Sequence, residues 1–172
     1  MTPLSKTVIR YGLLIITAAI LQRGLLSQIR IDGAVPDVLL VLAVAAGIVG
    51  GTDRGATVGF SSGLALDLMI TTPFGLAAIA YLAAGMVAGV LETSLVRSAR
   101  WLTIAIAAVS AVLGVVVFAL FGTLLGRSDL LDRQLVSTCL VVAASTAILV
   151  LPVMRVCRWA DRDLDHLRTS LR

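Results

Sequence analysis

The feature that most constrains this chain is the long apolar stretch over residues 36–89. It is punctuated by a Pro-Asp pair, a ladder of glycines, one aspartate inside an apolar run and a Pro-Phe-Gly triplet. A helix needs about 20 apolar residues to cross the hydrocarbon core of a membrane. Because lipid cannot hydrogen-bond a free backbone, only helices and closed barrels span it. The apolar runs here are continuous rather than alternating, which predicts an all-α, polytopic membrane protein.

The composition supports a membrane protein with a single transmembrane domain. Of the 172 residues, 59% are hydrophobic and only 14% are charged, whereas charged residues make up roughly a quarter of a soluble domain. The net charge of +4 fits anionic lipid headgroups and does not indicate a nucleic-acid partner. Cys139 and Cys157 offer no disulfide framework.

Six transmembrane helices are expected. They cover residues 8–26, 36–50, 56–70, a segment after residue 75 that ends near residue 91, 101–125 and 134–153. The two short connections, 51–55 and 71–75, are expected to be tight turns because they are rich in Gly, Thr and Pro. The second and third spans are shorter than a bilayer core, so neighbouring helices must shield them.

The chain is expected to divide into a transmembrane domain, 1–153, and a cytoplasmic amphipathic tail, 154–172. One helical stripe of that tail carries Val156, Ala160, Leu164, Leu167 and Leu171. Such a helix suits a membrane surface or a cytoplasmic partner.

The distribution of Lys and Arg predicts the orientation. With the N-terminus inside and six spans, ten of the 14 basic residues fall on the cytoplasmic side. Positive charge is enriched on that side of membrane proteins, so both termini are expected in the cytoplasm. The outer loop that carries Arg127, Asp129, Asp132 and Arg133 is either a solvated face or a contact for a periplasmic partner.

Glycines recur every four residues on the third span, at Gly55, Gly59 and Gly63, and the stripe continues to Asp67. Small residues at this spacing let two membrane helices approach to backbone contact. The fourth span repeats the spacing at Gly85 and Gly89 and is able to face the first stripe. Two interpretations remain open, which are packing inside the protein and docking of a partner.

Asp67 is the one acid deep in an apolar run. Intramembrane carboxylates are costly and face a protein interior or water. A structural role is expected, either by accepting hydrogen bonds from the 71–75 turn or by pairing with an arginine; the alternative is a proton or ion site. Asp37 follows Pro36 at a helix start, where the helix dipole favours an anion, so a capping role is expected.

The sequence offers little for catalysis. His166 is the single histidine, and no Cys/His pair, metal-ligand spacing or glycine-rich phosphate loop is present. No serine has a plausible base at membrane depth. We therefore expect no catalytic residue, no metal and no cofactor.

Taken together, several of these motifs resemble the rod shape-determining protein MreD family. They are Pro36-Asp37, Gly55-x-x-x-Gly59-Phe60-x-x-Gly63-Leu64-x-x-Asp67, Pro73-Phe74-Gly75, Ala80-Tyr81 and Gly85. Outside these motifs, the first span, the last two spans and the tail match only in hydropathy.

The resemblance implies a non-catalytic subunit of the bacterial elongasome in the inner membrane. Its partner would be MreC, with RodA, a class-B penicillin-binding protein and the MreB-linked complex as further partners, and its role would be control of cell shape and lateral peptidoglycan synthesis. The fold of that family is similar to the substrate-binding subunits of energy-coupling-factor transporters. That likeness supplies the alternative, a small-solute-binding subunit, which the scarcity of aromatic and buried polar residues disfavours.

Overall fold

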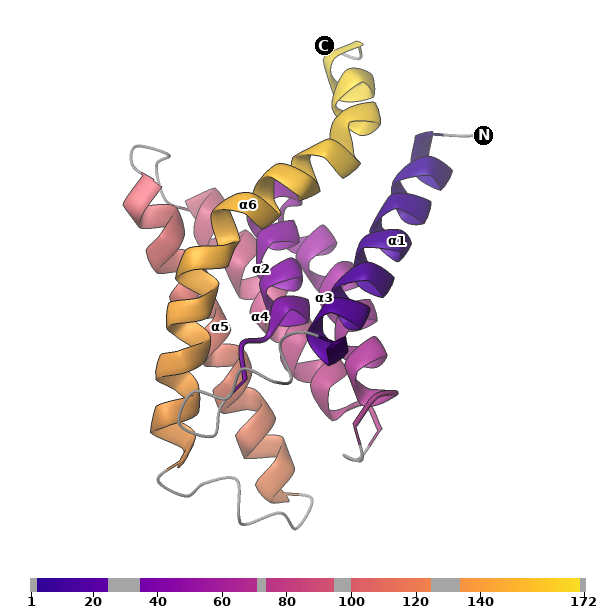
Figure 1. Cartoon of the computed structure of the whole chain (residues 1–172). Helices are drawn as coiled ribbons and strands as arrows, with labels where there is room; N and C mark the ends of the chain where they lie inside the picture. The colour runs from indigo at the N-terminus through magenta and orange to yellow at the C-terminus, as the bar shows by residue number, and fades with distance from the viewer. Residues whose placement is uncertain (1–2, 25–34, 71–73, 95–99, 125–133, 171–172) are drawn as a thin grey trace.

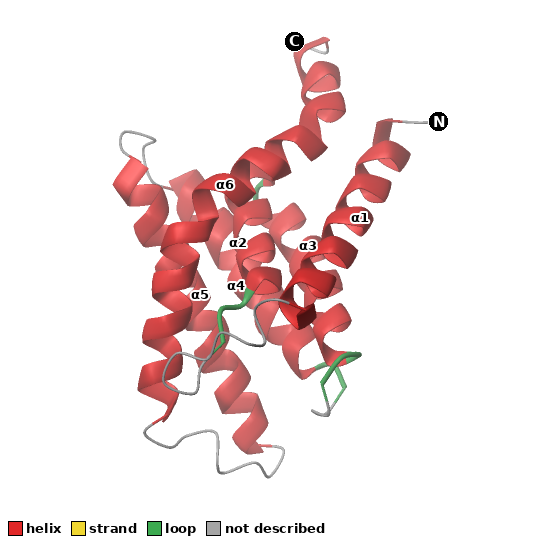
Figure 2. Ribbon diagram, in the orientation of Figure 1, coloured by secondary structure: helices red, strands yellow, loops and turns green. Residues whose placement is uncertain are grey.

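The computed structural model describes residues 3–24, 35–70, 74–94, 100–124 and 134–170, and it leaves out the side chains at 3–4, 94, 134 and 163–170. The described chain is all-helical (Figure 2). Its six helices are α1 (Pro3–Gly24), α2 (Val38–Gly50), α3 (Thr52–Asp67), α4 (Leu76–Ser94), α5 (Arg100–Leu124) and α6 (Gln134–Ser170). Consecutive helices run in alternating directions, and both termini lie at one end of the bundle (Figure 1). We call this the terminal end and the other the opposite end.

The short helix α2 forms the centre of the bundle. All residues from Val38 to Ile48 are buried, and α2 packs against every other helix. A 13-residue helix is only about 20 Å long, which is less than the ~30 Å thickness of a membrane core. Its neighbours shield it on all sides, as a short apolar helix requires.

Three of the helices described here are long and apolar enough to cross a membrane. The segments are Leu76–Thr93, Arg100–Leu124 and Leu135–Arg162, and α2 is a shorter apolar helix. Large apolar side chains also lie exposed along α1, where Val8, Leu13 and Ile20 are each at least 60% exposed. An apolar exterior of this kind is suited to contact with lipid and indicates a membrane protein.

The connection between α2 and α3 differs from the expected five-residue turn. Gly51 alone separates the two helices, and α3 begins at Thr52. Gly51 adopts φ 85°, a left-handed conformation that glycine reaches without strain. Its N–H donates to the Gly47 carbonyl, and its own carbonyl accepts from Gly55. As a consequence, Arg54 lies on the first turn of a helix rather than in a loop.

The last helix extends far beyond the expected span. α6 continues without a break through the 153/154 boundary to Ser170, with Pro152 inside it. Membrane helices tolerate proline because neighbouring groups satisfy the freed carbonyl, and α6 visibly changes direction along its length (Figure 1). The face that packs inward after the proline carries Met154, Cys157 and Asp161, whereas Val156 is 41% exposed. The side chains of Leu164, His166, Leu167 and Leu171 lie outside the described residues.

Candidate functional site

The glycine stripe of α3 packs directly on α4. A Cβ added at Gly59 would lie 2.3 Å from the Tyr81 carbonyl oxygen, and one at Gly63 would lie 2.4 Å from that of Ala77. The Gly55 and Gly85 positions approach each other's backbones in the same way, at 2.1 and 2.2 Å. These distances leave no room for a side chain. The stripe is therefore filled by the chain's own fourth helix.

Two further glycines extend this contact toward the terminal end. A Cβ at Gly89 would lie 2.5 Å from the Thr52 backbone nitrogen, and one at Gly47 would lie 2.2 Å from the Gly85 carbonyl oxygen. Gly47 belongs to α2, so three helices meet here at backbone distance. The sequence did not predict this contact of Gly47, because Gly47 lies outside the four-residue glycine repeats of the third and fourth spans.

Asp67 ends α3 and caps the start of α4. The side chain is 4% exposed, and its carboxylate accepts from the backbone N–H groups of Gly75 (3.0 Å), Ala77 (3.1 Å) and Ala78 (3.1 Å). The first N–H groups of a helix have no partner within the helix, and the dipole there favours an anion. Asp67 thus locks the end of α3 to the start of α4.

The turn between α3 and α4 is described only in part. Pro73, with residues 71–72, lies outside the described residues. Phe74 is 69% exposed, and Gly75 has φ 96°, which favours glycine. Arg23 at the end of α1 donates to the Met69 carbonyl beside this turn.

Asp37 caps α2 and also contacts α4. One carboxylate oxygen accepts from the Leu40 N–H at 3.1 Å, and the other accepts from the Tyr81 hydroxyl. Gln22 of α1 accepts from the Leu39 N–H at 3.1 Å, and Pro36 is buried beside the cap. The opposite end of the bundle is therefore held by two aspartates that accept hydrogen bonds from the first N–H groups of helices, the partly buried Asp37 and the buried Asp67.

A second polar cluster lies at the terminal end and joins three helices. The Arg54 guanidinium of α3 forms an ion pair with Asp161 of α6, and Tyr11 of α1 donates to the same carboxylate at 3.0 Å. Asp161 is 4% exposed, and the guanidinium carbon also lies 5.9 Å from the Tyr11 ring centroid. We call Tyr11, Arg54 and Asp161 the terminal cluster.

A neighbouring contact strengthens the link between α1 and α6. Arg10 donates to the Ala160 carbonyl at 3.3 Å, and its guanidinium carbon lies 5.2 Å from the Trp159 ring centroid. Guanidinium groups over aromatic faces are attracted by the ring quadrupole. The segment expected to be a separate tail is therefore anchored on α1 as far as Asp161.

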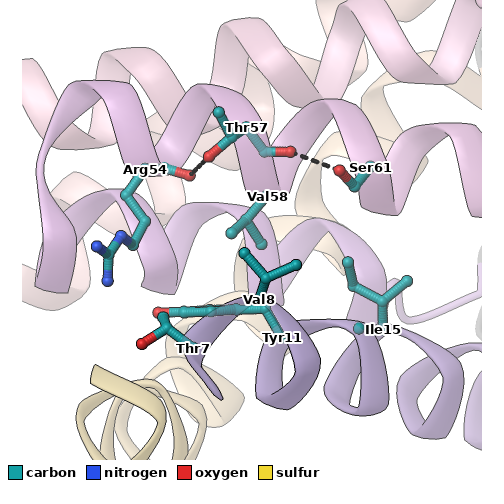
Figure 3. Close-up of a pocket in the computed structure, with 9 residues that line it drawn as sticks. Thr7, Val8, Tyr11, Ile15, Arg54, Thr57, Val58 and Ser61 are labelled. Carbon is teal, nitrogen blue, oxygen red and sulfur yellow. Dashed lines mark hydrogen bonds between the residues drawn. The ribbon is translucent and has the colours of Figure 1, made fainter. Parts of the chain in front are cut away.

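A groove runs between α1 and α3 beside the terminal cluster (Figure 3). Its volume is about 350 Å³. The residues that line it are Thr7, Val8, Tyr11, Gly12 and Ile15 of α1, and Arg54, Thr57, Val58 and Ser61 of α3. We call it the α1–α3 groove. The Thr57 and Ser61 hydroxyls donate to the carbonyls of Arg54 and Thr57, so they are satisfied within α3.

The terminal cluster was not expected from the sequence. Arg54 falls in the segment 51–55 that was expected to be a turn, and Asp161 falls in the segment 154–172 that was expected to be a tail. One feature of the sequence pointed to burial of Asp161: its spacing places it on the same helical face as Met154 and Cys157. The partners are 107 and 150 residues away in sequence, so no local pattern joins them.

Four of the residues named from the sequence belong to the loop between α5 and α6. Arg127, Asp129, Asp132 and Arg133 lie outside the described residues. Within the described part of the chain, no group of three His, Cys, Asp or Glu side chains is placed to hold a metal ion, and Cys139 and Cys157 are free thiols.

Comparisons of the chain with protein-family models, with curated proteins and with solved structures found no match.

Proposed function

We propose that this chain is a non-catalytic membrane subunit that acts as MreD does in the bacterial elongasome. In this proposal it binds MreC and helps to control cell shape and lateral peptidoglycan synthesis, with RodA, a class-B penicillin-binding protein and the MreB-linked complex as further partners. The resemblance of the motifs in residues 36–85 is the starting point. The structure supports the proposal through the contacts that the residues of these motifs make.

The observation that carries the proposal is the hydrogen bonding of Asp67. Both of its oxygens accept from backbone N–H groups of α4, and these bonds serve helix capping rather than chemistry. The glycines Gly55, Gly59, Gly63 and Gly85 likewise bring backbones together. The MreD-like residues thus build a rigid bundle, which suits a scaffold that presents its outer surface to partners.

The proposal includes a topology of six spans in the inner membrane with both termini in the cytoplasm. The central position of α2 explains how a helix of 13 residues is accommodated. At the terminal end, the described side chains include seven basic and three acidic residues. They are Lys6, Arg10, Arg54, Arg100, Arg155, Arg158 and Arg162 against Asp53, Glu92 and Asp161. An excess of positive charge marks the cytoplasmic side.

The experiment that tests this function is co-purification from native membranes, followed by identification of the bound subunits. We expect an MreC-class bitopic protein in stoichiometric amount, and rounded cells with mislocalised wall synthesis when the chain is depleted. A tagged, unrelated six-helix membrane protein serves as the control. Absence of MreC from the purified complex, together with unchanged cell shape, would contradict the proposal.

A small-solute-binding subunit is the second candidate, because a cavity lies beside Asp37 and Tyr81 at the opposite end. Its volume is about 180 Å³, and Leu40, Leu66, Gly114, Phe118 and Val142 also line it. Small-molecule sites usually measure about 300–1,000 Å³, and the carboxylate of Asp37 is already engaged with Leu40 and Tyr81. These facts favour the scaffold. Saturable binding of a solute that Tyr81→Phe abolishes would favour the second candidate instead.

A further inference from the structure

We propose that the α1–α3 groove binds one acyl chain of an anionic phospholipid from the leaflet at the terminal end, with the lipid phosphate beside Arg54. The proposal rests on the membrane-spanning arrangement given above, but it does not depend on the MreC partnership. The experiment below measures lipid binding alone, so its failure leaves the proposed function standing.

The position of the groove suits a lipid. Val8 lines it and is 68% exposed, and Phe60 on the neighbouring surface of α3 is 45% exposed. The groove therefore opens at the outer surface of the bundle, between two helices, rather than into its centre. In the proposed arrangement, that surface faces hydrocarbon.

The charged residue of the lining, Arg54, lies toward the terminal end of the groove, whereas the polar Ser61 at the deeper end has its hydroxyl bonded within α3. α1 and α3 both run away from the terminal end. Thr7, Tyr11 and Arg54 lie on the turns nearest that end, whereas Ile15 and Val58 lie deeper (Figure 3). Seven or eight residues of helix correspond to about 10–12 Å. A phospholipid likewise has its charged headgroup at the membrane surface and its acyl chains directed inward.

The floor of the groove is kept open by Gly12. A Cβ at this position would meet no atom within 4 Å, in contrast to the glycines of α3. Gly12 therefore serves no close approach within the described chain. The absence of a side chain here leaves volume that an acyl chain can fill, flanked by Val8 and Val58.

Charge complementarity selects an anionic headgroup. A guanidinium carries five N–H donors in a planar fork that matches phosphate, and Arg54 uses one nitrogen for Asp161. Lys6 is exposed one helical turn from Arg10 at the same end of α1. The excess of basic side chains at this end outweighs the buried Asp161 carboxylate and favours anionic over zwitterionic lipid.

The test is a lipid titration of the delipidated full-length protein in detergent, followed by native mass spectrometry. The probes are a phosphatidylglycerol, a phosphatidylcholine with the same chains, and soluble glycerol phosphate. We expect one phosphatidylglycerol per chain, bound about tenfold more tightly than phosphatidylcholine, a difference of about 1.4 kcal/mol. Equal affinity for glycerol phosphate and the lipid would show a phosphate site without a chain site and would overturn the proposal.

Gly12→Leu is the decisive variant, because it fills the groove with a side chain that has space to enter. We expect it to weaken phosphatidylglycerol binding by about tenfold or more. Gly24→Leu is the matched control, since a Cβ at Gly24 also meets no atom within 4 Å and Gly24 does not line the groove. Ser61→Leu, an exposed position on the α3 side, blocks the groove independently if Gly12→Leu folds poorly.

The charge is tested by the double variant Arg54→Gln/Asp161→Asn. It removes the cation and its buried partner together and keeps an acceptor for Tyr11. We expect the preference for phosphatidylglycerol over phosphatidylcholine to disappear. Unchanged binding in both groove-filling variants would overturn the proposal, as would a transmembrane helix of another protein occupying the groove in a purified complex.

Discussion

The Arg54 guanidinium on α3 forms an ion pair with the buried Asp161 carboxylate on α6, 107 residues further along the chain. This pair, together with the Tyr11 hydroxyl, fixes the position of α6 after Pro152. Arg54 is partly exposed and Asp161 is buried, so the two members of the pair respond differently to substitution.

Arg54→Gln is expected to destabilise the protein more than Asp161→Asn. The first change leaves a buried carboxylate without a cation, which costs about 3–5 kcal/mol in a fully buried pair and about 2 kcal/mol here because solvent partly screens Arg54. The second keeps an acceptor for Tyr11. Denaturant unfolding in micelles measures the free energies, and the double variant should recover part of the loss. Strictly additive effects would show that the two groups do not interact.

Asp67→Asn is expected to retain the fold and partner assembly, whereas Asp67→Leu is expected to lose both. Asn keeps one acceptor oxygen, but Leu leaves the Gly75, Ala77 and Ala78 N–H groups without the carboxylate, at about 1–3 kcal/mol for each unsatisfied donor. Folded yield and co-purification measure the outcome. If the Asn variant folds and assembles but is inactive, the charge itself is essential, and the structural role would be replaced by an ion or proton site.

Gly59→Ala is expected to destabilise the bundle. A Cβ at Gly59 would lie 2.3 Å from the Tyr81 carbonyl oxygen, so α3 and α4 must separate, at a cost of about 1–3 kcal/mol or more. Gly12→Ala is the matched control, because its Cβ meets no atom within 4 Å and alanine favours the helix by roughly 0.5–1 kcal/mol. Thermal unfolding in detergent compares the two. Equal stability would mean that α3 and α4 are not in backbone contact.

The proposed topology predicts that reporter fusions alternate between the two sides of the membrane. Fusions after residues 98 and 172 should report the cytoplasm, and fusions after residues 30, 72 and 130 should report the outside. The reason is that six spans with an excess of Lys and Arg at the terminal end place that end inside. Finding residues 130 and 172 on the same side would exclude the sixth span.

The sequence by itself determined the class of this protein and the number of its helices. Continuous apolar runs separated by Gly and Pro predicted an all-α membrane protein, and the described structure has six helices near the expected positions. The acid within the third run predicted a buried, hydrogen-bonded group, and Asp67 is buried with backbone partners. These features follow from local rules, because helix formation and helix capping depend on residues close together in the chain.

Only the tertiary structure decided which polar groups meet at the terminal end and where the surface is hollow. Arg54 was assigned to a loop because Gly51 and Gly55 read as a turn, but Gly51 alone makes the connection and α3 starts at Thr52. This places Arg54 on a helical face toward Tyr11 and Asp161. The α1–α3 groove likewise depends on how two helices lie side by side. The contacts of Asp161 join residues 107 and 150 positions apart, and the groove joins residues of α1 with residues of α3. Packing sets these pairings, and the periodicity of a single helix does not encode them.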